Sequence, residues 1–379
     1  MSKKPYGATC LGPEAYNNWK KWSENHEGWF TCEYPLFTDA HVTGELTKNL
    51  GPYQFINAVP RSLGKCVALT LILRVEIPGG MGDIPPMEET DDFCYHGGTM
   101  IDELAALLSL QMGIRLRAGK SIRTFYPEGD PKGRPEAFEM PPDPVTPQYS
   151  DWPVVPNVRG KHPMPEPTLF SRLIELNAAD AIVLIKTSRL YQDALWISES
   201  QPEMSWLMMV SAVETAAHHW RQSNEKPVER LRISQPKLEQ ILISSGGEDH
   251  LSRVAEIMAP YMGATKKFID FVMKFLPSPP SIRPPEWAQC SWDPRNMKKA
   301  LSKIYNHRSK ALHGGIPFPK PMCTPPMKAE GFLAEKPHGK AAFERGGVWV
   351  EDDLPMVLNT FEFITRNVLL RWWSSILEV

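Results

Sequence analysis

The chain has 379 residues, and its 42 Lys and Arg against 44 Asp and Glu give a formal net charge of −2. This length accommodates two domains that each bury a core. The near-zero charge excludes a broad basic surface for unspecific binding of duplex nucleic acid, but it leaves room for a small local RNA site.

The sequence carries no membrane or export signal. No stretch approaches the roughly 20 apolar residues of a membrane span, and no apolar run follows the first four residues as in a signal peptide. Six cysteines lie scattered without a Cys-x-x-Cys pair, at positions 10, 32, 66, 94, 290 and 323. This spacing favours reduced thiols over disulfides or structural zinc. We therefore expect a cytoplasmic protein with no membrane partner, no bound metal and no cofactor.

Residues 1–126 are predicted to form a small α+β module. The clearest strand is Cys66 to Ile77, in which Leu and Val residues alternate with mostly polar ones. A helix is predicted from Met100 to Met112, and a Thr-x-x-Asp capping box precedes it. Ile114 to Phe125 is a further candidate strand. The module resembles no family that we recognise, and its residues indicate no ligand.

One short stretch of this module contains three kinds of metal ligand. Residues 91–96 read Asp-Asp-Phe-Cys-Tyr-His, so Asp, Cys and His lie close together. These residue types bind metal ions in proteins. Because no second cluster is evident, an ordinary loop is the favoured interpretation.

A Pro-rich segment, residues 127–168, follows the module. It contains twelve of the chain's 37 prolines. Such a density is typical of a linker or an extended arm rather than of a regular element. The apolar residues Trp152, Val154 and Val155 suggest that part of this segment packs on a neighbouring element.

Residues 169–379 are predicted to form an all-α bundle. Apolar residues recur there at helical spacing, whereas Pro and Gly interrupt residues 316–350, which we expect to be irregular. The expected fold is thus an α+β N-terminal module joined by a Pro-rich segment to a helical bundle. Six of the predicted helices are Ala178–Ser198, Pro202–Trp220, Lys237–Ser244, Leu251–Tyr261, Thr265–Leu276 and Leu354–Leu377.

One carboxylate is unusual in its helix. From Met204 to Trp220 the only formally charged residue, with His neutral, is Glu214. A helix that is apolar nearly all round is buried, and a buried carboxylate needs a partner or a proton. We expect the partner to be Arg308, which is an equally unusual charge in another apolar stripe. The alternative is that Glu214 points to a polar rim beside His218, four residues later.

A further helix carries the most informative pattern of the chain. Asp293 can cap its start, and Pro294 fits its first turn. Its apolar stripe consists of Met297, Leu301, Ile304, Ala311 and Leu312. Arg308 falls on this stripe, where a surface arginine is not expected. His313 closes the helix, and Gly314 is its predicted left-handed stop.

Arg308 and His313 do not share a face of an ideal helix, because five residues place them about 140° apart and about 7.5 Å along the axis. They meet in one site if the arginine bends, if the last turn unwinds, or if two copies of the helix face each other. The third route predicts a dimer. A structural interpretation stays open, in which His313 caps carbonyls and Arg308 snorkels or pairs with a buried acid.

The segment Tyr305-x-x-Arg308-Ser309-x-x-x-His313-Gly314 resembles the motif of the Apea-like group of HEPN (higher eukaryote and prokaryote nucleotide-binding) domains. The helix pair upstream and the long helix downstream also resemble that family. The resemblance covers a little over half of the chain. Many HEPN motifs carry Asn, Asp or His directly after the Arg, whereas Ser309 follows the Apea-like variant.

The resemblance implies an all-α bundle that is often dimeric. Many members cleave RNA without metal and act in toxin–antitoxin or anti-phage systems, and others lack demonstrated activity. For this chain it implies a metal-independent endoribonuclease that cleaves through the RNA 2′-hydroxyl, with His313 as general base or acid and Arg308 on the scissile phosphate. The expected supporting residues are Ser309, Asn306, Tyr305 and Glu214. The expected products carry 2′,3′-cyclic phosphate and 5′-hydroxyl ends.

The partners that follow from this interpretation are RNA (tRNA or mRNA), a second copy of the chain, and an antitoxin or other regulatory partner. The alternative is a non-catalytic HEPN module that binds a nucleotide, RNA or a protein. A third interpretation is a two-part defence effector, in which residues 1–126 sense a trigger and release the helical site.

Overall fold

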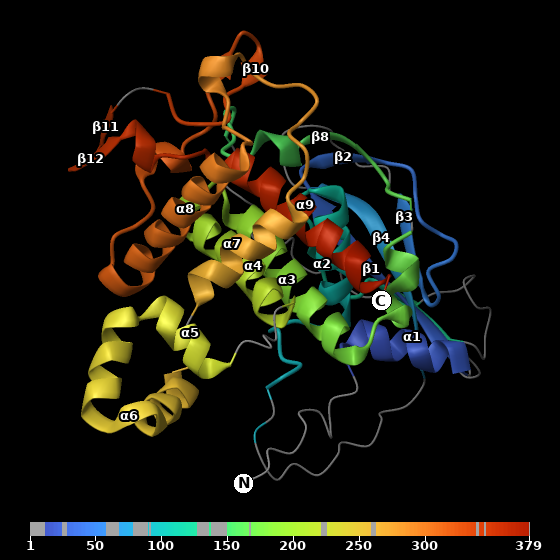
Figure 1. Cartoon of the computed structure of the whole chain (residues 1–379). Helices are drawn as coiled ribbons and strands as arrows, with labels where there is room; N and C mark the ends of the chain where they lie inside the picture. The colour runs from blue at the N-terminus through green and yellow to red at the C-terminus, as the bar shows by residue number, and fades with distance from the viewer. Residues whose placement is uncertain are drawn as a thin grey trace.

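The computed structural model describes residues 12–24, 29–57, 68–78, 90, 92–126, 136–137, 150–166, 168–220, 226–258, 263–338, 341–344 and 346–378. An N-terminal α/β region and a C-terminal helical region lie against each other (Figure 1). The predicted division into an α+β part and a helical part is confirmed at this level.

The N-terminal region is built on an antiparallel sheet with the order β3-β4-β1-β6-β7. Its strands are β1 (Trp29–Thr38), β3 (Tyr53–Asn57), β4 (Ala68–Pro78), β6 (Arg123–Phe125) and β7 (Glu136–Ala137), and β5 (Arg117–Ala118) also pairs with β1. In β4 the alternate side chains Leu71, Leu73 and Val75 are fully buried, as the period-2 pattern predicted. The candidate strand from Ile114 to Phe125 contains the two short strands β5 and β6.

Two helices accompany the sheet, α1 (Glu14–Glu24) and α2 (Met100–Met112). The bounds predicted for α2 are confirmed, and the Asp102 carboxylate of its capping box accepts a hydrogen bond from the backbone N–H of Thr99 at 2.9 Å. Nearly every side chain of α2 is buried, because it packs against α1 and β5 as well as α3 and α9. It therefore joins the two regions.

Seven helices belong to the described part of the second half. They are α3 (Ala178–Ile197), α4 (Pro202–Trp220), α5 (Pro227–Ser234), α6 (Pro236–Met258), α7 (Ala264–Phe275), α8 (Pro294–Gly314) and α9 (Leu358–Ile376). Helix α4 packs against α3, α7, α8 and α9 and is central, as its apolar sequence predicted.

The pair α5–α6 differs from the prediction. The pattern predicted separate helices at Lys237–Ser244 and Leu251–Tyr261, but α6 runs across both and is broken at Gly247, whose φ is 72°. Helix α5 was not predicted. This pair extends away from the main body (Figure 1) and has a small core of its own, made of Leu231, Leu242, Leu251 and Ala255.

The Pro-rich segment takes part in the fold where it is described. Strand β8 (Gly160–Pro163) pairs in parallel with β2 (Ala40–Thr43), and β7 extends the main sheet. Val154 and Val155 are buried, as their apolar character indicated, whereas Trp152 is exposed. Residues 316–350 contain short hairpin strands: β9 (Lys328–Ala329), β10 (Phe332–Leu333), β11 (Ala341–Glu344) and β12 (Gly347–Val350). The 3₁₀ turns are η1 (Pro156–Val158), η2 (Phe170–Glu175), η4 (Glu286–Ala288), η5 (Lys320–Cys323) and η6 (Glu351–Asp353).

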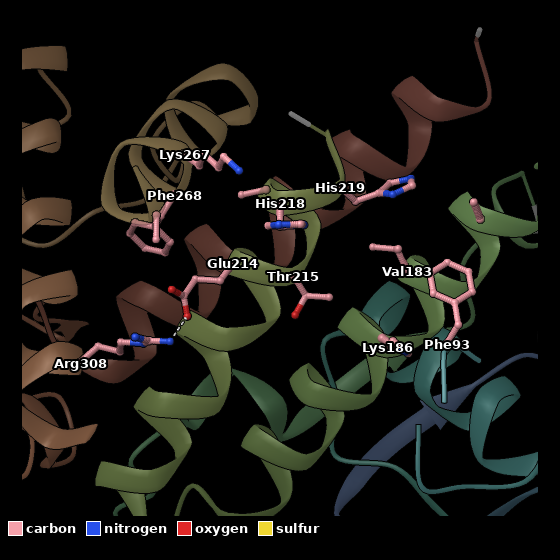
Figure 2. Close-up of a pocket in the computed structure, with 13 residues that line it drawn as sticks. Phe93, Val183, Lys186, Glu214, Thr215, His218, His219, Lys267, Phe268 and Arg308 are labelled. Atoms are coloured by element: carbon pink, nitrogen blue, oxygen red, sulfur yellow. Dashed lines mark hydrogen bonds and ion pairs between the residues drawn. The ribbon is translucent and has the colours of Figure 1, made fainter. Parts of the chain in front are cut away.

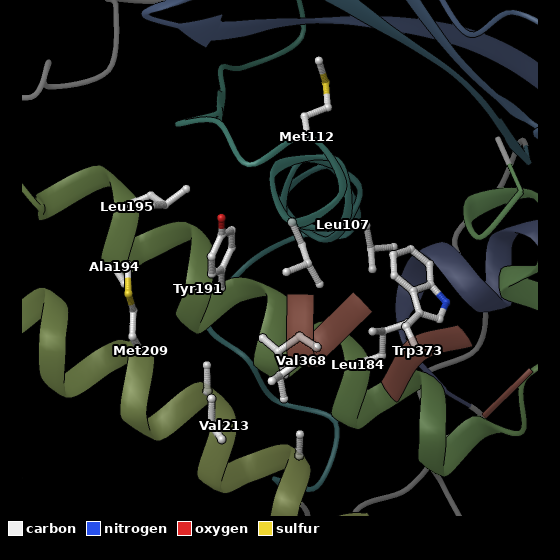
Figure 3. Packing of buried hydrophobic residues seen from close by; sticks show 14 of the residues in the cluster. Leu107, Met112, Leu184, Tyr191, Ala194, Leu195, Met209, Val213, Val368 and Trp373 are labelled. Atoms are coloured by element: carbon white, nitrogen blue, oxygen red, sulfur yellow. The ribbon is translucent and has the colours of Figure 1, made fainter. Parts of the chain in front are cut away.

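The largest cluster of buried side chains runs without interruption through both regions. Figure 3 shows its centre, where Leu107 of α2, Tyr191 of α3, Val213 of α4 and Trp373 of α9 gather between the sheet and the bundle. Because this core is shared, each region buries apolar side chains of the other.

A buried arginine adds a polar link between the regions. Arg115 donates to Asp39 between β1 and β2 at 2.6 Å, to the Leu195 carbonyl of α3 at 2.8 Å, and to Glu199 just beyond α3. Arg115 is fully buried, and the two carboxylates compensate its charge.

The expectation that all cysteines are reduced thiols is corrected at one position. Cys94 is disulfide-bonded, whereas Cys32, Cys290 and Cys323 are free and buried. Over the described ranges, no helix combines the length and apolar character that crossing a membrane requires.

Candidate functional site

The helix that carries the motif, α8, forms for the predicted reasons. The Asp293 side chain accepts hydrogen bonds from the backbone N–H groups of Arg295 and Asn296, at 3.0 and 3.2 Å. The stripe residues Met297, Leu301 and Ile304 are fully buried. The predicted stop is displaced by one residue: α8 includes Gly314, and Gly315 takes the left-handed conformation with φ 63° and donates to the Lys310 carbonyl.

Glu214 of α4 and Arg308 of α8 form the predicted ion pair. Arg308 Nη2 donates to Glu214 Oε2 at 2.7 Å, and the Tyr305 hydroxyl donates to Oε1 of the same carboxylate, also at 2.7 Å. The two charged side chains are 20% and 18% exposed, so they lie at the edge of the core rather than inside it. The Arg308 guanidinium carbon also lies 5.5 Å from the centre of the Tyr305 ring.

This network has a fixed hydrogen-bond direction. Burial raises the pKa of Tyr305 well above its ordinary value, and the hydrogen bond to Glu214 and the charge of Glu214 raise it further, while Arg308 acts in the opposite direction. Tyr305 therefore keeps its proton at neutral pH, and its hydroxyl donates a hydrogen bond to Glu214. The carboxylate is held on both oxygens, and it holds Arg308 in turn.

Arg308 and Glu214 lie on the wall of a pocket of about 850 Å³ between α3, α4, α7 and α8 (Figure 2). Its lining residues are Phe93, Ala179, Val183, Lys186, Glu214, Thr215, Ala217, His218, His219, Ala264, Lys267, Phe268 and Arg308. Three cations, Lys186, Lys267 and Arg308, face one acid, so the lining is net positive in a chain whose net charge is −2. Local charge of this sign favours an anionic ligand.

The pocket has two chemically distinct ends. Arg308 and Glu214 lie at one end, and Phe93 and Val183 lie at the other (Figure 2). The Lys186 ammonium lies 5.7 Å from the centre of the Phe93 ring. A ligand with an anionic group and a flat apolar group matches this division.

The other residues of the motif lie outside the pocket. His313 and Asn306 are exposed, Ser309 is half-buried, and none of the three lines it. This agrees with the helical geometry, which places Arg308 and His313 on different faces. Exposed apolar residues flank His313, since Leu312 is 50% and Ile316 is 56% exposed.

Several pocket residues were not predicted from the sequence. His218 lies one turn beyond Glu214 on α4 and lines the same pocket (Figure 2). The spacing of four residues was the available signal. The neighbouring His219 also lines the pocket, but its side chain is engaged: its Nε2 lies 2.5 Å from Asp180 Oδ1, and its ring meets Trp372 edge-on. Lys267 and Phe93 come from distant segments and left no local signal.

The possible metal ligands of residues 91–96 are only partly described, because Asp91 lies outside the described residues. His96 Nε2 lies 2.7 Å from the buried Glu103, whose carboxylate also accepts from the backbone N–H groups that begin α1. Within the described ranges, no group of three or more His, Cys, Asp or Glu residues is arranged to hold a metal ion.

Comparisons of the chain with protein-family models, with curated proteins and with solved structures give no match. The likeness to the Apea-like HEPN group thus rests on the motif and on the order of the helices.

Proposed function

We propose that this chain is a metal-independent endoribonuclease of the HEPN type that cleaves RNA through the 2′-hydroxyl. The observation that carries the proposal is the Arg308 guanidinium, held by Glu214 on the wall of a positively charged pocket. Such an arrangement binds a phosphodiester and offsets the charge that develops as the phosphorus is attacked.

In this proposal Arg308 binds the scissile phosphate. Its Nη2 bond to Glu214 uses one of the five N–H groups of the guanidinium, so donors are left for a ligand. Glu214 and Tyr305 act as positioning residues. A nucleobase of the RNA stacks at the Phe93 end of the pocket, because stacking on an aromatic ring accepts any of the four bases.

His313 acts from a second copy of the chain in this proposal. Its exposed position and its distance along α8 from Arg308 prevent a simple single-chain site, whereas Leu312 and Ile316 offer apolar surface for a symmetric contact. A homodimer would bring His313 of one copy to Arg308 of the other. An effector role in toxin–antitoxin or anti-phage systems, with an antitoxin as regulatory partner, belongs to the same proposal.

The test is cleavage of total RNA and tRNA in EDTA by the full chain, with analysis of the new ends and of the mass in solution. We expect 2′,3′-cyclic phosphate and 5′-hydroxyl ends, no cleavage of DNA, and a dimer. Arg308→Ala and His313→Ala should each lower the rate by at least about 100-fold. Cleavage at the wild-type rate by both folded variants would refute the assignment.

The second candidate is a non-catalytic module that binds RNA or a nucleotide in the same pocket. The exposed position of His313, outside the pocket, favours it. This function predicts that the wild type binds a fluorescent RNA, that Arg308→Ala weakens binding, and that no RNA is cleaved by the wild-type dimer.

A further inference from the structure

Cleavage of RNA through its 2′-hydroxyl needs two proton transfers. A base removes the proton of the 2′-hydroxyl as its oxygen attacks phosphorus, and an acid protonates the 5′-oxygen as its bond to phosphorus breaks. Within the motif, Tyr305 and Arg308 both donate to Glu214, which leaves His313 as the one proton-transfer group per copy. A second proton-transfer group is therefore missing from the site as the motif defines it.

We propose that His218 of α4 is this second group, a catalytic residue in the Arg308 pocket; the inference rests on the proposed function. His218 lies one helical turn from Glu214, which holds Arg308 at 2.7 Å, and it lines the same pocket (Figure 2). Its side chain is exposed, so substrate and solvent reach it. A phosphate on Arg308 is thus within the same pocket as the imidazole.

The other polar residues that line the pocket are less suited to this task. Lys186 and Lys267 carry ammonium groups, which donate hydrogen bonds and do not accept them. Glu214 already accepts from Arg308 and Tyr305. His219 is bound to Asp180 and packed edge-on against Trp372, which fixes it in the contact between α3, α4 and α9.

The reaction balances without any further reagent. The neutral imidazole of His218 takes the proton of the 2′-hydroxyl, the O2′–P bond forms, and the P–O5′ bond breaks. The protonated imidazole of His313 gives its proton to the 5′-oxygen. The products are the 2′,3′-cyclic phosphate and the 5′-hydroxyl, and proton exchange with water restores both imidazoles.

The deciding experiment is single-turnover cleavage by His218→Ala with and without added imidazole. The matched control is His250→Ala, which removes an exposed helical histidine of α6 that does not line the pocket. Binding is measured separately by fluorescence anisotropy with RNA that carries 2′-O-methyl groups and cannot be cleaved. Circular dichroism and thermal unfolding monitor the fold of both variants.

We expect His218→Ala to lose about 10²- to 10⁴-fold in rate, to keep its affinity for the methylated RNA within about 2-fold, and to regain activity with imidazole. His250→Ala should match the wild type. Full activity of His218→Ala, a loss that imidazole does not restore, or a loss explained by weaker binding would each overturn the inference. If His218→Ala cleaves RNA and Arg308→Ala does not, the inference about His218 fails and the proposed function stands. If the wild-type dimer does not cleave RNA, the proposed function fails as well.

Discussion

At the scale of single residues, the central feature is a carboxylate shared by two donors. Glu214 accepts from Tyr305 and Arg308 at 2.7 Å each, at the boundary between core and pocket. Charge-assisted hydrogen bonds of this geometry fix the direction of a guanidinium. The arrangement explains why an arginine lies in the apolar stripe of α8.

Substitution of this arginine separates a structural role from a functional one. Arg308→Ala leaves Glu214 with the Tyr305 bond and partial access to water, since the carboxylate side chain is 18% exposed. We expect the free energy of unfolding to fall by about 1–3 kcal/mol, measured by urea denaturation, while the protein stays folded. A loss large enough to unfold the chain would make Arg308 a structural residue and remove the main support of the proposed function.

The buried His307 gives the chain a pH-dependent stability. Its Nε2–H donates to the Asp353 carbonyl at 2.8 Å, and burial lowers its pKa below the ordinary value of 6.5. Below about pH 6.5 the unfolded chain binds a proton that the folded chain does not. The contribution of His307 to stability is therefore complete above that pH and decreases as the pH falls toward the folded-state pKa.

His307→Gln tests this because an amide keeps the donor and does not titrate. We expect the wild type to lose more unfolding free energy than His307→Gln between pH 7.5 and pH 5.5. Urea denaturation of both proteins at the two pH values measures the two losses. The contributions of the other titrating groups are the same in both proteins and cancel when the losses are subtracted. Equal losses in the two proteins would show that His307 takes up its proton in the folded state.

At the scale of elements, α2 is held at both ends by specific groups. Gly113, the residue that follows α2, has φ 67°, and Arg366 of α9 donates to the Leu110 carbonyl at 3.0 Å and to the Gln111 carbonyl. A β-carbon at Gly113 would lie 2.8 Å from Arg366 Nε. The glycine is thus needed both for its conformation and for the approach of the arginine.

Two glycine substitutions separate these effects. Gly315→Ala introduces only the left-handed strain, because nothing lies within 4 Å of its added β-carbon, and should cost about 1–2 kcal/mol. Gly113→Ala adds the clash with Arg366 and should cost more than Gly315→Ala in urea denaturation. Equal costs would mean that Arg366 moves away freely and does not hold the end of α2.

The elements that sequence patterns predicted well are those with local signals. Helices α2, α3 and α4 begin and end within one residue of the predicted positions, because caps, prolines and 3.6-residue periodicity lie within each segment. Strand β1 was missed for a physical reason. Most of its residues are buried on both faces, so the alternation is absent, and Pro35 interrupts the strand-like pattern.

At the scale of the whole molecule, the two regions share their largest core and the buried Arg115. Removal of residues 1–168 would expose the side chains of α3 and α9 that α2 covers. Such a truncation therefore tests stability rather than release of the helical site by a sensor. We expect heat and urea to unfold both regions in one cooperative transition.

Arg115→Met tests the link between the regions. It leaves Asp39 and Glu199 buried with one remaining donor each, the Arg159 guanidinium and the Val154 N–H. We expect a loss of about 3–5 kcal/mol in the free energy of unfolding. The control is Arg172→Met, which removes a partly exposed pair with Glu175 worth roughly 0–1 kcal/mol and one hydrogen bond to the Leu377 carbonyl, and should therefore cost less than Arg115→Met. Losses of equal size in the two variants would contradict a linking role for Arg115.

The sequence by itself determined the helical class of the second half, the bounds of α3 and α4, and the expected pairing of Glu214 with Arg308, whereas α6 runs across two predicted helices and α9 begins at Leu358 rather than Leu354. The helices follow from caps and periodicity within single segments, and the ion pair follows from the rule that a buried charge needs a partner. Tertiary structure decided that Phe93, Lys186, His218 and Lys267 line one pocket with Arg308, and that His313 does not. These residues come together only through the packing of α3, α4, α7 and α8, which no short stretch of sequence encodes.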